Sequence, residues 1–296
     1  MNKDNSVTIR VWGDFACFTR PEMKVERVSY PLPTPSAARG ILEAIYWEPE
    51  MYYLIDSVHV IKKGRWFNFR RNEVTKVVGL NEVTKWMKGA KPIAYIEAGG
   101  GAPDAAQRNM LALADVEYLI TAEVHTSRRY NPARNDKGKY FREIRDRVAK
   151  GKCCHRPALG CREFAAEFDL VEDIETTLRQ RSQVIRGSPD WQQAWSEEDL
   201  GLMLYDVFDH DQRVEGFRWL KPEELAERQR QREEQVKHLP TREQNKAMKD
   251  KLPDHAGIMI RPLAYFFHAQ IKGSVMDCHP ERIKVIRSQS QEIGPC

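Results

Sequence analysis

Long apolar segments are missing from this sequence, and their absence excludes two classes of protein. The N-terminus, MNKDNSVTIR, is polar and lacks the apolar core of a secretory signal peptide. No apolar run approaches the ~20 residues that a membrane-spanning helix needs. The longest candidate, residues 263–271, is interrupted by His268 and Gln270. We therefore expect a soluble, cytoplasmic protein that does not associate with a membrane.

Regularly spaced cysteines are missing as well. The six cysteines show no repeating spacing, which favours reduced thiols over a disulfide framework. The residues that suggest a zinc site are Cys153, Cys154, His155, Cys161, Cys278 and His279. None of these cysteines forms the CxxC pair of a structural zinc site. We expect neither a metal nor another cofactor.

Charge is abundant where apolar residues are few. Hydrophobic residues make up 41% of the chain and charged residues 30%, which favours an extended charged surface over a deep apolar pocket. The net charge is only +4, but residues 128–162 contain twelve Lys and Arg against three acidic residues. That excess is sufficient to bind a phosphate backbone if it lies on one face.

The first part of the chain predicts a strand, a helix and two strands. Alternating apolar residues predict a strand over residues 6–18. Thr34 followed by Pro35 predicts the start of a helix over 36–46, because the threonine oxygen caps free amides and proline needs none. Strands follow over 52–61 and 65–71.

The middle of the chain predicts further elements of an α+β domain. Residues 72–91 are polar and predict an excursion from the sheet, with a short strand over 93–96. A strand over 111–125, a basic helix over 139–149 and a strand over 164–171 follow. This order predicts a ferredoxin-like (RRM-like) α+β domain over residues 1–175.

The C-terminal part, residues 176–296, is predicted to be β-rich. Residues 202–207 and 258–271 are the candidate strands. Between them, residues 223–251 are highly charged and have few large apolar side chains, which predicts a solvated helical insertion.

Several runs of the sequence together resemble one protein family. They are VWGDFACFTRPEMKVERVSY (11–30), PTPSAARGILEAIYW (33–47), RRNEV (70–74) and LALADVEYLITAEVH (111–125), with GCREF (160–164) and DLG (199–201) in addition. These runs resemble the Cas five family of type I CRISPR systems, variant d (subtype I-C). The resemblance covers most of residues 6–210 and weakens past residue 220.

The resemblance implies a fold, an activity and a set of partners. It implies a ferredoxin-like N-terminal domain with a small β-rich C-terminal part. It also implies metal-independent cleavage of precursor CRISPR RNA within each repeat. The protein then remains on the 5′ handle of the guide in the Cascade complex, beside the large subunit and a Cas seven backbone subunit, where target DNA binds. Two alternatives stay open: a subunit that only caps the handle, and an unrelated RRM-like RNA-binding module.

Metal-independent RNA cleavage uses the 2′-hydroxyl as nucleophile and needs a base, a cation and an acid. The resemblance implies a tyrosine, a lysine and a histidine in these roles, and Tyr46 matches the tyrosine. The lysine and histidine are expected in or near the strand over 111–125, but Ala114-Asp115-Val116-Glu117 contains neither. His125 is the nearest imidazole, and an imidazole suits acid–base chemistry. Alternatively, Tyr46 only packs on the sheet and His125 only contacts solvent or the handle.

Basic and aromatic side chains are the candidates for RNA binding. Arg39, in the first turn of the helix, is placed to meet a phosphate, and Trp12 is placed to stack on a base. Phe15 and Phe18 could also stack, but core packing is the simpler interpretation. Arg162 is expected to pair with a carboxylate or a phosphate. The remaining candidates are Arg10, Arg20, Lys24, Arg27, Arg70, Arg71, Arg128 and Arg129.

Overall fold

The structure is a computed structural model of the whole chain. It describes residues 5–89, 96–99, 101–185, 197–207, 218–219, 222–249, 255–256 and 264–287. Most of the predicted strand over 93–96 and the first part of the predicted strand over 258–271 lie outside the described residues. None of the helices in the described ranges is long and apolar enough to span a membrane.

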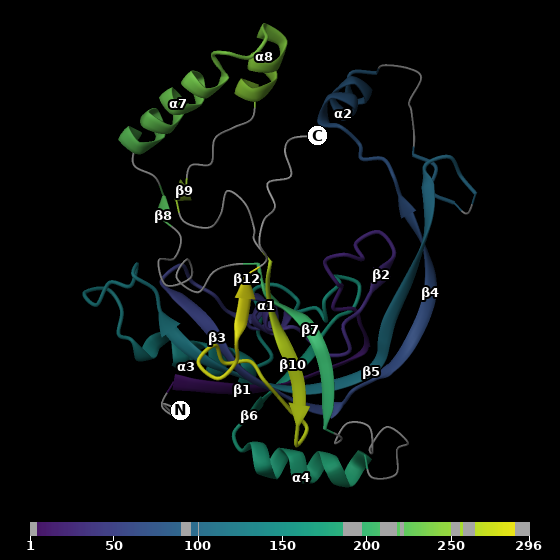
Figure 1. Cartoon of the computed structure of the whole chain (residues 1–296), viewed down its shortest axis with the longest axis vertical. Coiled ribbons are helices and arrows are strands. Elements are labelled where there is room, and N and C mark those ends of the chain that lie inside the picture. The colour runs from purple at the N-terminus through teal and green to yellow at the C-terminus, as the bar shows by residue number, and fades with distance from the viewer. Residues whose placement is uncertain are drawn as a thin grey trace.

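One large, mostly antiparallel sheet organises the chain (Figure 1). Along its main path the strands follow the order β12-β10-β11-β3-β5-β1-β6, and β2, β4 and β7 join at the sides. The bounds of the N-terminal strands are β1 Ser6–Ala16, β2 Arg27–Val28, β3 Met51–Lys62, β4 Arg65–Val74, β5 Ala105–Thr126 and β6 Glu167–Val171. Those of the C-terminal strands are β7 Glu198–Asp206, β10 Tyr265–Lys272, β11 Val275–Asp277 and β12 Val285–Arg287. Sheet and helices together confirm the predicted α+β class.

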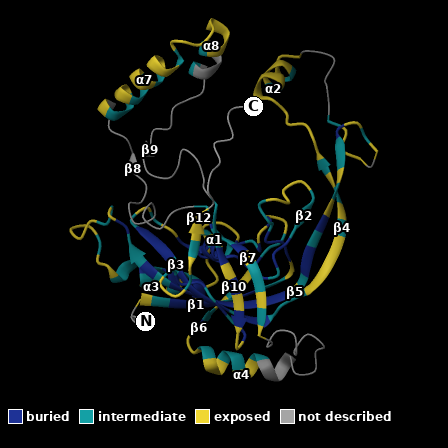
Figure 2. Ribbon diagram, viewed as in Figure 1, coloured by how far each residue is buried: buried dark blue, intermediate teal, exposed yellow. Residues whose placement is uncertain are grey.

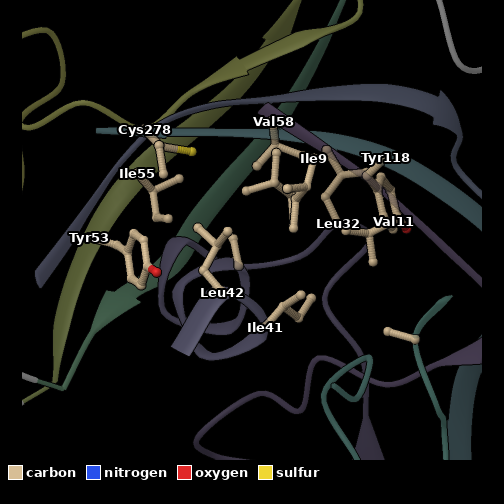
Figure 3. Packing of buried hydrophobic residues seen from close by; sticks show 14 of the residues in the cluster. Ile9, Val11, Leu32, Ile41, Leu42, Tyr53, Ile55, Val58, Tyr118 and Cys278 are labelled. Atoms are coloured by element: carbon tan, nitrogen blue, oxygen red, sulfur yellow. The ribbon is translucent and has the colours of Figure 1, made fainter. Parts of the chain in front are cut away.

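Helix α1 (Pro35–Ile45) begins where the sequence predicted. The Thr34 hydroxyl accepts a hydrogen bond of 3.1 Å from the Ala37 amide, and Pro35 occupies the first turn. Figure 3 shows Ile41 and Leu42 of α1 packed against side chains of the sheet. Helix α3 (Gly138–Ala149) buries Tyr140, Ile144 and Val148 in the same core. Both helices therefore cover one face of the sheet.

Strand β5 is long enough to serve two parts of the molecule. Its second half pairs with β1 and β3, whereas its first half pairs with β4. The β4–β5 pair curves away from the core and has helix α2 (Leu80–Met87) at its far end (Figure 1). Figure 2 shows that β4 is largely exposed, so this pair forms an arm with little cover.

A helix that the sequence did not predict, α4 (Ile174–Ile185), packs on the other face of the sheet. Ile174 and Leu178 contact a small core of Ile61, Leu119 and Val171. Arg181 donates two hydrogen bonds of 2.6 Å to the buried Glu117 carboxylate on β5. The sheet is therefore covered on both faces in its central part.

The C-terminal strands continue the same sheet. β11 pairs with β3, and β10 pairs with β7, β11 and β12. Arg282 bonds the buried Asp56 of β3 at 2.8 Å, which ties this part to the central strands. The insertion is helical as predicted, with α7 (Pro222–Val236) and α8 (Thr241–Lys249), and β8 (Arg218–Trp219) pairs with β9 (His255–Ala256) beside it.

Candidate active site and RNA-binding surface

Tyr46 lies where α1 ends and the chain turns toward β3. Its ring is almost fully buried in the main core. The hydroxyl donates a hydrogen bond of 2.6 Å to Oε1 of Glu48, and the backbone oxygen accepts one of 2.7 Å from Tyr53. Burial, and then the Glu48 carboxylate, raises the pKa of Tyr46 well above its ordinary value. At neutral pH the hydroxyl therefore stays protonated and acts as a donor.

Lys139 meets the same carboxylate from helix α3. Its Nζ lies 3.2 Å from Oε1 and 3.1 Å from Oε2 of Glu48. The side chains of Lys139 and Glu48 are 37% and 33% exposed, so both reach solvent. A hydroxyl, a carboxylate and an ammonium group thus lie together, and we call Tyr46, Glu48 and Lys139 the Tyr46 cluster. Lys139 lies in the predicted basic helix, and no local pattern in the sequence associates it with Tyr46.

The turn that carries Glu48 is held in place by the chain that follows β5. The Ser127 amide donates to the Glu50 backbone oxygen at 2.8 Å, and the Ser127 hydroxyl donates to the Pro49 oxygen at 3.0 Å. The Glu50 carboxylate accepts hydrogen bonds from Asn135 at 2.9 Å and from Tyr140 at 2.5 Å. These contacts fix residues 127–137 beside the Tyr46 cluster.

Residues 127–137 form a basic loop that includes two predicted RNA contacts. Arg128 is exposed and Arg129 is half-buried, and the exposed Arg134 and Lys137 follow in the same loop. The structure therefore brings the predicted cations of this loop to the turn that carries the candidate catalytic residue.

The end of α1 is also contacted by Arg147 of α3 and by residues that follow α3. The guanidinium of Arg147 lies 5.1 Å from the centroid of the Tyr46 ring. The backbone amides of Cys154 and His155 donate to the Ala44 oxygen at 3.0 and 2.9 Å. These contacts cap free carbonyls at the helix end, and so hold Tyr46 in its position.

His125 lies on the opposite face of the sheet from Tyr46. Its neighbour Val124 belongs to the core that contains Tyr46, and successive residues of a strand point to opposite faces. The imidazole stacks on Tyr52 with ring centroids 5.3 Å apart, and its Nε2 lies 2.8 Å from Glu123 Oε2. The structure does not bring the two predicted catalytic residues together, and the role of His125 stays a prediction.

Arg10 and Trp12 lie on the face that α4 covers. Arg10 donates to Glu117 at 2.6 Å and to Asp169 at 3.2 Å. Its guanidinium lies 3.9 Å from the centroid of the Trp12 ring. The cation and the ring are thus engaged within the protein, and their predicted contact with RNA stays a prediction.

Arg39 is buried between α1 and β7. It forms ion pairs with Glu43 at 2.6 Å and with Asp206 at 3.3 Å. Its side chain is only 10% exposed, so binding a phosphate would require this pairing to open. In the structure Arg39 ties the helix to the C-terminal strands.

The remaining predicted cations gather near the base of the arm. Glu163 lies 2.5 Å from Arg71 and 4.0 Å from Arg27, and Glu73 pairs with both arginines. Arg20 stacks on the Tyr30 ring at 4.8 Å. Lys24, Arg70 and Arg162 are exposed. Among the residues that the structure describes, no group of three or more His, Cys, Asp or Glu side chains is arranged to hold a metal.

A family model and two curated relatives agree on one family. A family model described as CRISPR-associated protein (Cas_Cas5) matches residues 6–269. CRISPR pre-crRNA endoribonuclease Cas5d of Mannheimia succiniciproducens is 39% identical over 220 residues, covering 72% of this chain and 90% of the relative. The protein of the same name from Thermus thermophilus is 44% identical over 161 residues, covering 54% of this chain and 62% of the relative. A crystal structure described as a CRISPR-associated protein is 18% identical with a TM-score of 0.47, covering 92% of this chain and 90% of that chain.

Proposed function

This chain belongs to the Cas5d family, and on that premise we propose that it is a CRISPR pre-crRNA endoribonuclease. In this proposal it cleaves precursor CRISPR RNA within the repeat, without a metal, and remains on the 5′ handle in a surveillance complex. The large subunit, a Cas seven subunit and target DNA are its proposed neighbours there. The single observation that carries the chemistry is the Tyr46 cluster.

Each member of the Tyr46 cluster has a role in this mechanism. Glu48 accepts the proton of the 2′-hydroxyl, whose oxygen attacks the adjacent phosphorus. Lys139 stabilises the negative charge that develops on the phosphorane. Tyr46 is kept protonated by burial and by Glu48. Because it is only 3% exposed, RNA binding must uncover its hydroxyl, which is released from Glu48 once that carboxylate has taken the 2′-hydroxyl proton and then donates its own proton to the departing 5′-oxygen. The products are a 2′,3′-cyclic phosphate and a 5′-hydroxyl.

The basic loop supports the same site as an RNA contact. Residues 127–137 carry four cations, Arg128, Arg129, Arg134 and Lys137, and lie against the turn that holds Glu48. Cations at this position neutralise phosphates and position the backbone without reading its sequence. We assign the phosphates next to the scissile bond to this loop.

The order of elements supports a ferredoxin-like domain over residues 1–175. Apart from the short strand β2 and the arm elements β4 and α2, the chain runs β1, α1, β3, β5, α3, β6, and these strands lie in the order β3-β5-β1-β6. This is the β-α-β-β-α-β arrangement of ferredoxin-like domains. Residues 176–296 then form the proposed C-terminal part.

Cleavage of repeat RNA in EDTA tests the proposal. Wild-type protein should cut the repeat, whereas Tyr46→Phe should lose at least about 100-fold in single-turnover rate, because the donor is removed, and should still bind the repeat. Tyr52→Phe is the matched control, since Tyr52 lies on the opposite face, and should cleave normally.

The other outcomes identify the alternatives. Binding of the repeat by wild-type protein without cleavage would leave a subunit that only caps the handle. The contacts of the Tyr46 cluster within the described residues include no imidazole, which is the observation in favour of that alternative. Equal affinity for unrelated RNA would favour a general RRM-like binding module.

A further inference from the structure

Four phenylalanine rings gather at the base of the β4–β5 arm, remote from the Tyr46 cluster. Phe15 lies 5.4 Å from Phe67 and 5.8 Å from Phe164, measured between ring centroids. Phe69 lies 5.5 Å from Phe67 and 6.1 Å from Phe164. We call these four rings the aromatic ledge.

The inner part of the ledge is supported and its outer part is open. Phe69 and Phe164 pack against a small buried core of Cys17, Met110, Ala112 and Cys161. Phe15 and Phe67, in contrast, are 37% and 41% exposed. The supported rings fix the exposed ones, so a flat ligand could stack on Phe15 or Phe67 with little loss of side-chain freedom.

Arginines share the face of the arm that carries the ledge. Because side chains alternate along a strand, Arg65 and Arg71 lie on the same face of β4 as Phe67, and Arg108 of β5 lies opposite Arg71. Arg71 shares the carboxylates of Glu73 and Glu163 with Arg27.

The surroundings of the ledge are therefore positively charged. Within the described part of the chain, Arg65, Arg108 and Arg162 form no ion pair. Five arginines thus surround the ledge against two glutamates. This favours an anionic partner over an apolar protein surface.

We propose that the aromatic ledge binds unstacked bases of single-stranded RNA, with the surrounding arginines contacting its phosphates. Stacked aromatic rings beside a cationic path are the means by which proteins hold single strands. The inference rests on the proposed function, because the RNA is the CRISPR repeat. The ledge contributes affinity rather than bond cleavage, because it is far from the Tyr46 cluster. Ala112 of β5 pairs with Phe67 of the ledge, and Ser127 contacts the turn that carries Glu48. These two positions are separated by roughly 50 Å of extended chain.

The test compares Phe67→Ala, Phe67→Trp and Trp66→Ala in the full-length protein, using repeat RNA in EDTA. Phe67→Ala should weaken binding at least about 5-fold, whereas Phe67→Trp should keep it. Trp66, 52% exposed on the opposite face of β4, is the matched control and should leave affinity unchanged. At saturating RNA, Phe67→Ala should cleave at the wild-type rate. The fluorescence of a 2-aminopurine base in the repeat should be quenched by stacking when wild-type protein, Phe67→Trp or Trp66→Ala binds. With Phe67→Ala this quenching should be lost.

The proposal that the ledge binds RNA would be overturned if Phe67→Ala bound repeat RNA as tightly as the wild type. It would also be overturned if Trp66→Ala lost as much RNA affinity as Phe67→Ala. If Phe67→Ala kept its RNA affinity but no longer joined the purified complex, the ledge would be a protein-docking site instead, and the proposal would also fail. Either result leaves cleavage by the Tyr46 cluster intact. Conversely, a protein that binds the repeat through Phe67 but never cuts it contradicts the proposed function and supports the ledge.

Discussion

At the scale of single residues, the proposed chemistry depends on Glu48. It is the one group that contacts both other members of the cluster, at 2.6 Å from the Tyr46 hydroxyl and 3.1 Å from the Lys139 ammonium. A carboxylate in this position orients both side chains before RNA arrives. In the proposed mechanism it is also the proton acceptor for the 2′-hydroxyl.

Glu48→Gln should therefore abolish most of the cleavage while leaving binding intact. The amide keeps the shape of the side chain but cannot accept a proton as a base, so the single-turnover rate should fall about 100-fold or more. The rate and the dissociation constant are both measured with repeat RNA in EDTA.

His125→Asn is the matched variant for this experiment, because His125 pairs with Glu123 on the opposite face. It should cleave at the wild-type rate. Unchanged or faster cleavage by Glu48→Gln would contradict the role of Glu48. A large loss in His125→Asn would restore the sequence-based prediction for the histidine.

At the scale of elements, helix α4 is held to the sheet by the Arg181–Glu117 ion pair and by the apolar side chains of Ile174 and Leu178. The Glu117 carboxylate is 2% exposed and accepts hydrogen bonds from Arg10 and Arg181. A buried carboxylate depends on such partners, because its desolvation is costly when a partner is removed.

Arg181→Gln should therefore destabilise the protein by about 1–3 kcal/mol of unfolding free energy. The shift of the urea midpoint measures the loss. Gln180→Ala, at an exposed position of the same helix, should change stability by less than about 0.5 kcal/mol. If Arg181→Gln shifted the urea midpoint no more than the control variant did, α4 would not be anchored through Glu117.

The elements also show what could and could not be predicted from the sequence. Thr34-Pro35 and the alternating pattern of residues 6–18 predicted α1 and β1 correctly, because both signals are local. Helix α4 was not predicted, since in the part of it whose side chains the structure describes, the apolar contacts with the sheet come from Ile174 and Leu178. Its burial depends on Glu117, which lies far away in the sequence.

The candidate site was likewise predictable only in part. Tyr46 could be selected from the sequence because it matches the tyrosine that the family resemblance implies at the end of the first helix. Lys139 could not be associated with Tyr46 from the sequence, because Lys139 and Glu48 are 91 residues apart. The packing of α3 beside α1 brings them into contact. For the same reason the burial of Arg39 was not foreseen: its partner Asp206 is 167 residues away.

At the scale of the whole molecule, one sheet connects the candidate active site to the aromatic ledge. β5 carries the basic loop at its C-terminal end and pairs with β4 at its N-terminal end. A single strand of RNA bound by both surfaces would therefore follow this sheet. The family resemblance predicted from residues 6–210 is confirmed, whereas the division at residue 175 stays a prediction because C-terminal strands join the same sheet.

The proposed activity is cleavage of repeat RNA through the RNA's own 2′-hydroxyl. The most direct measurement compares all-ribose repeat RNA with a repeat that carries one 2′-deoxynucleotide immediately 5′ of the cut, both in EDTA. We predict equal binding, a 2′,3′-cyclic phosphate and a 5′-hydroxyl from the first RNA, and no cleavage at that position in the second. Cleavage of the deoxy-substituted bond at a comparable rate would contradict the account, because attack would then come from another nucleophile.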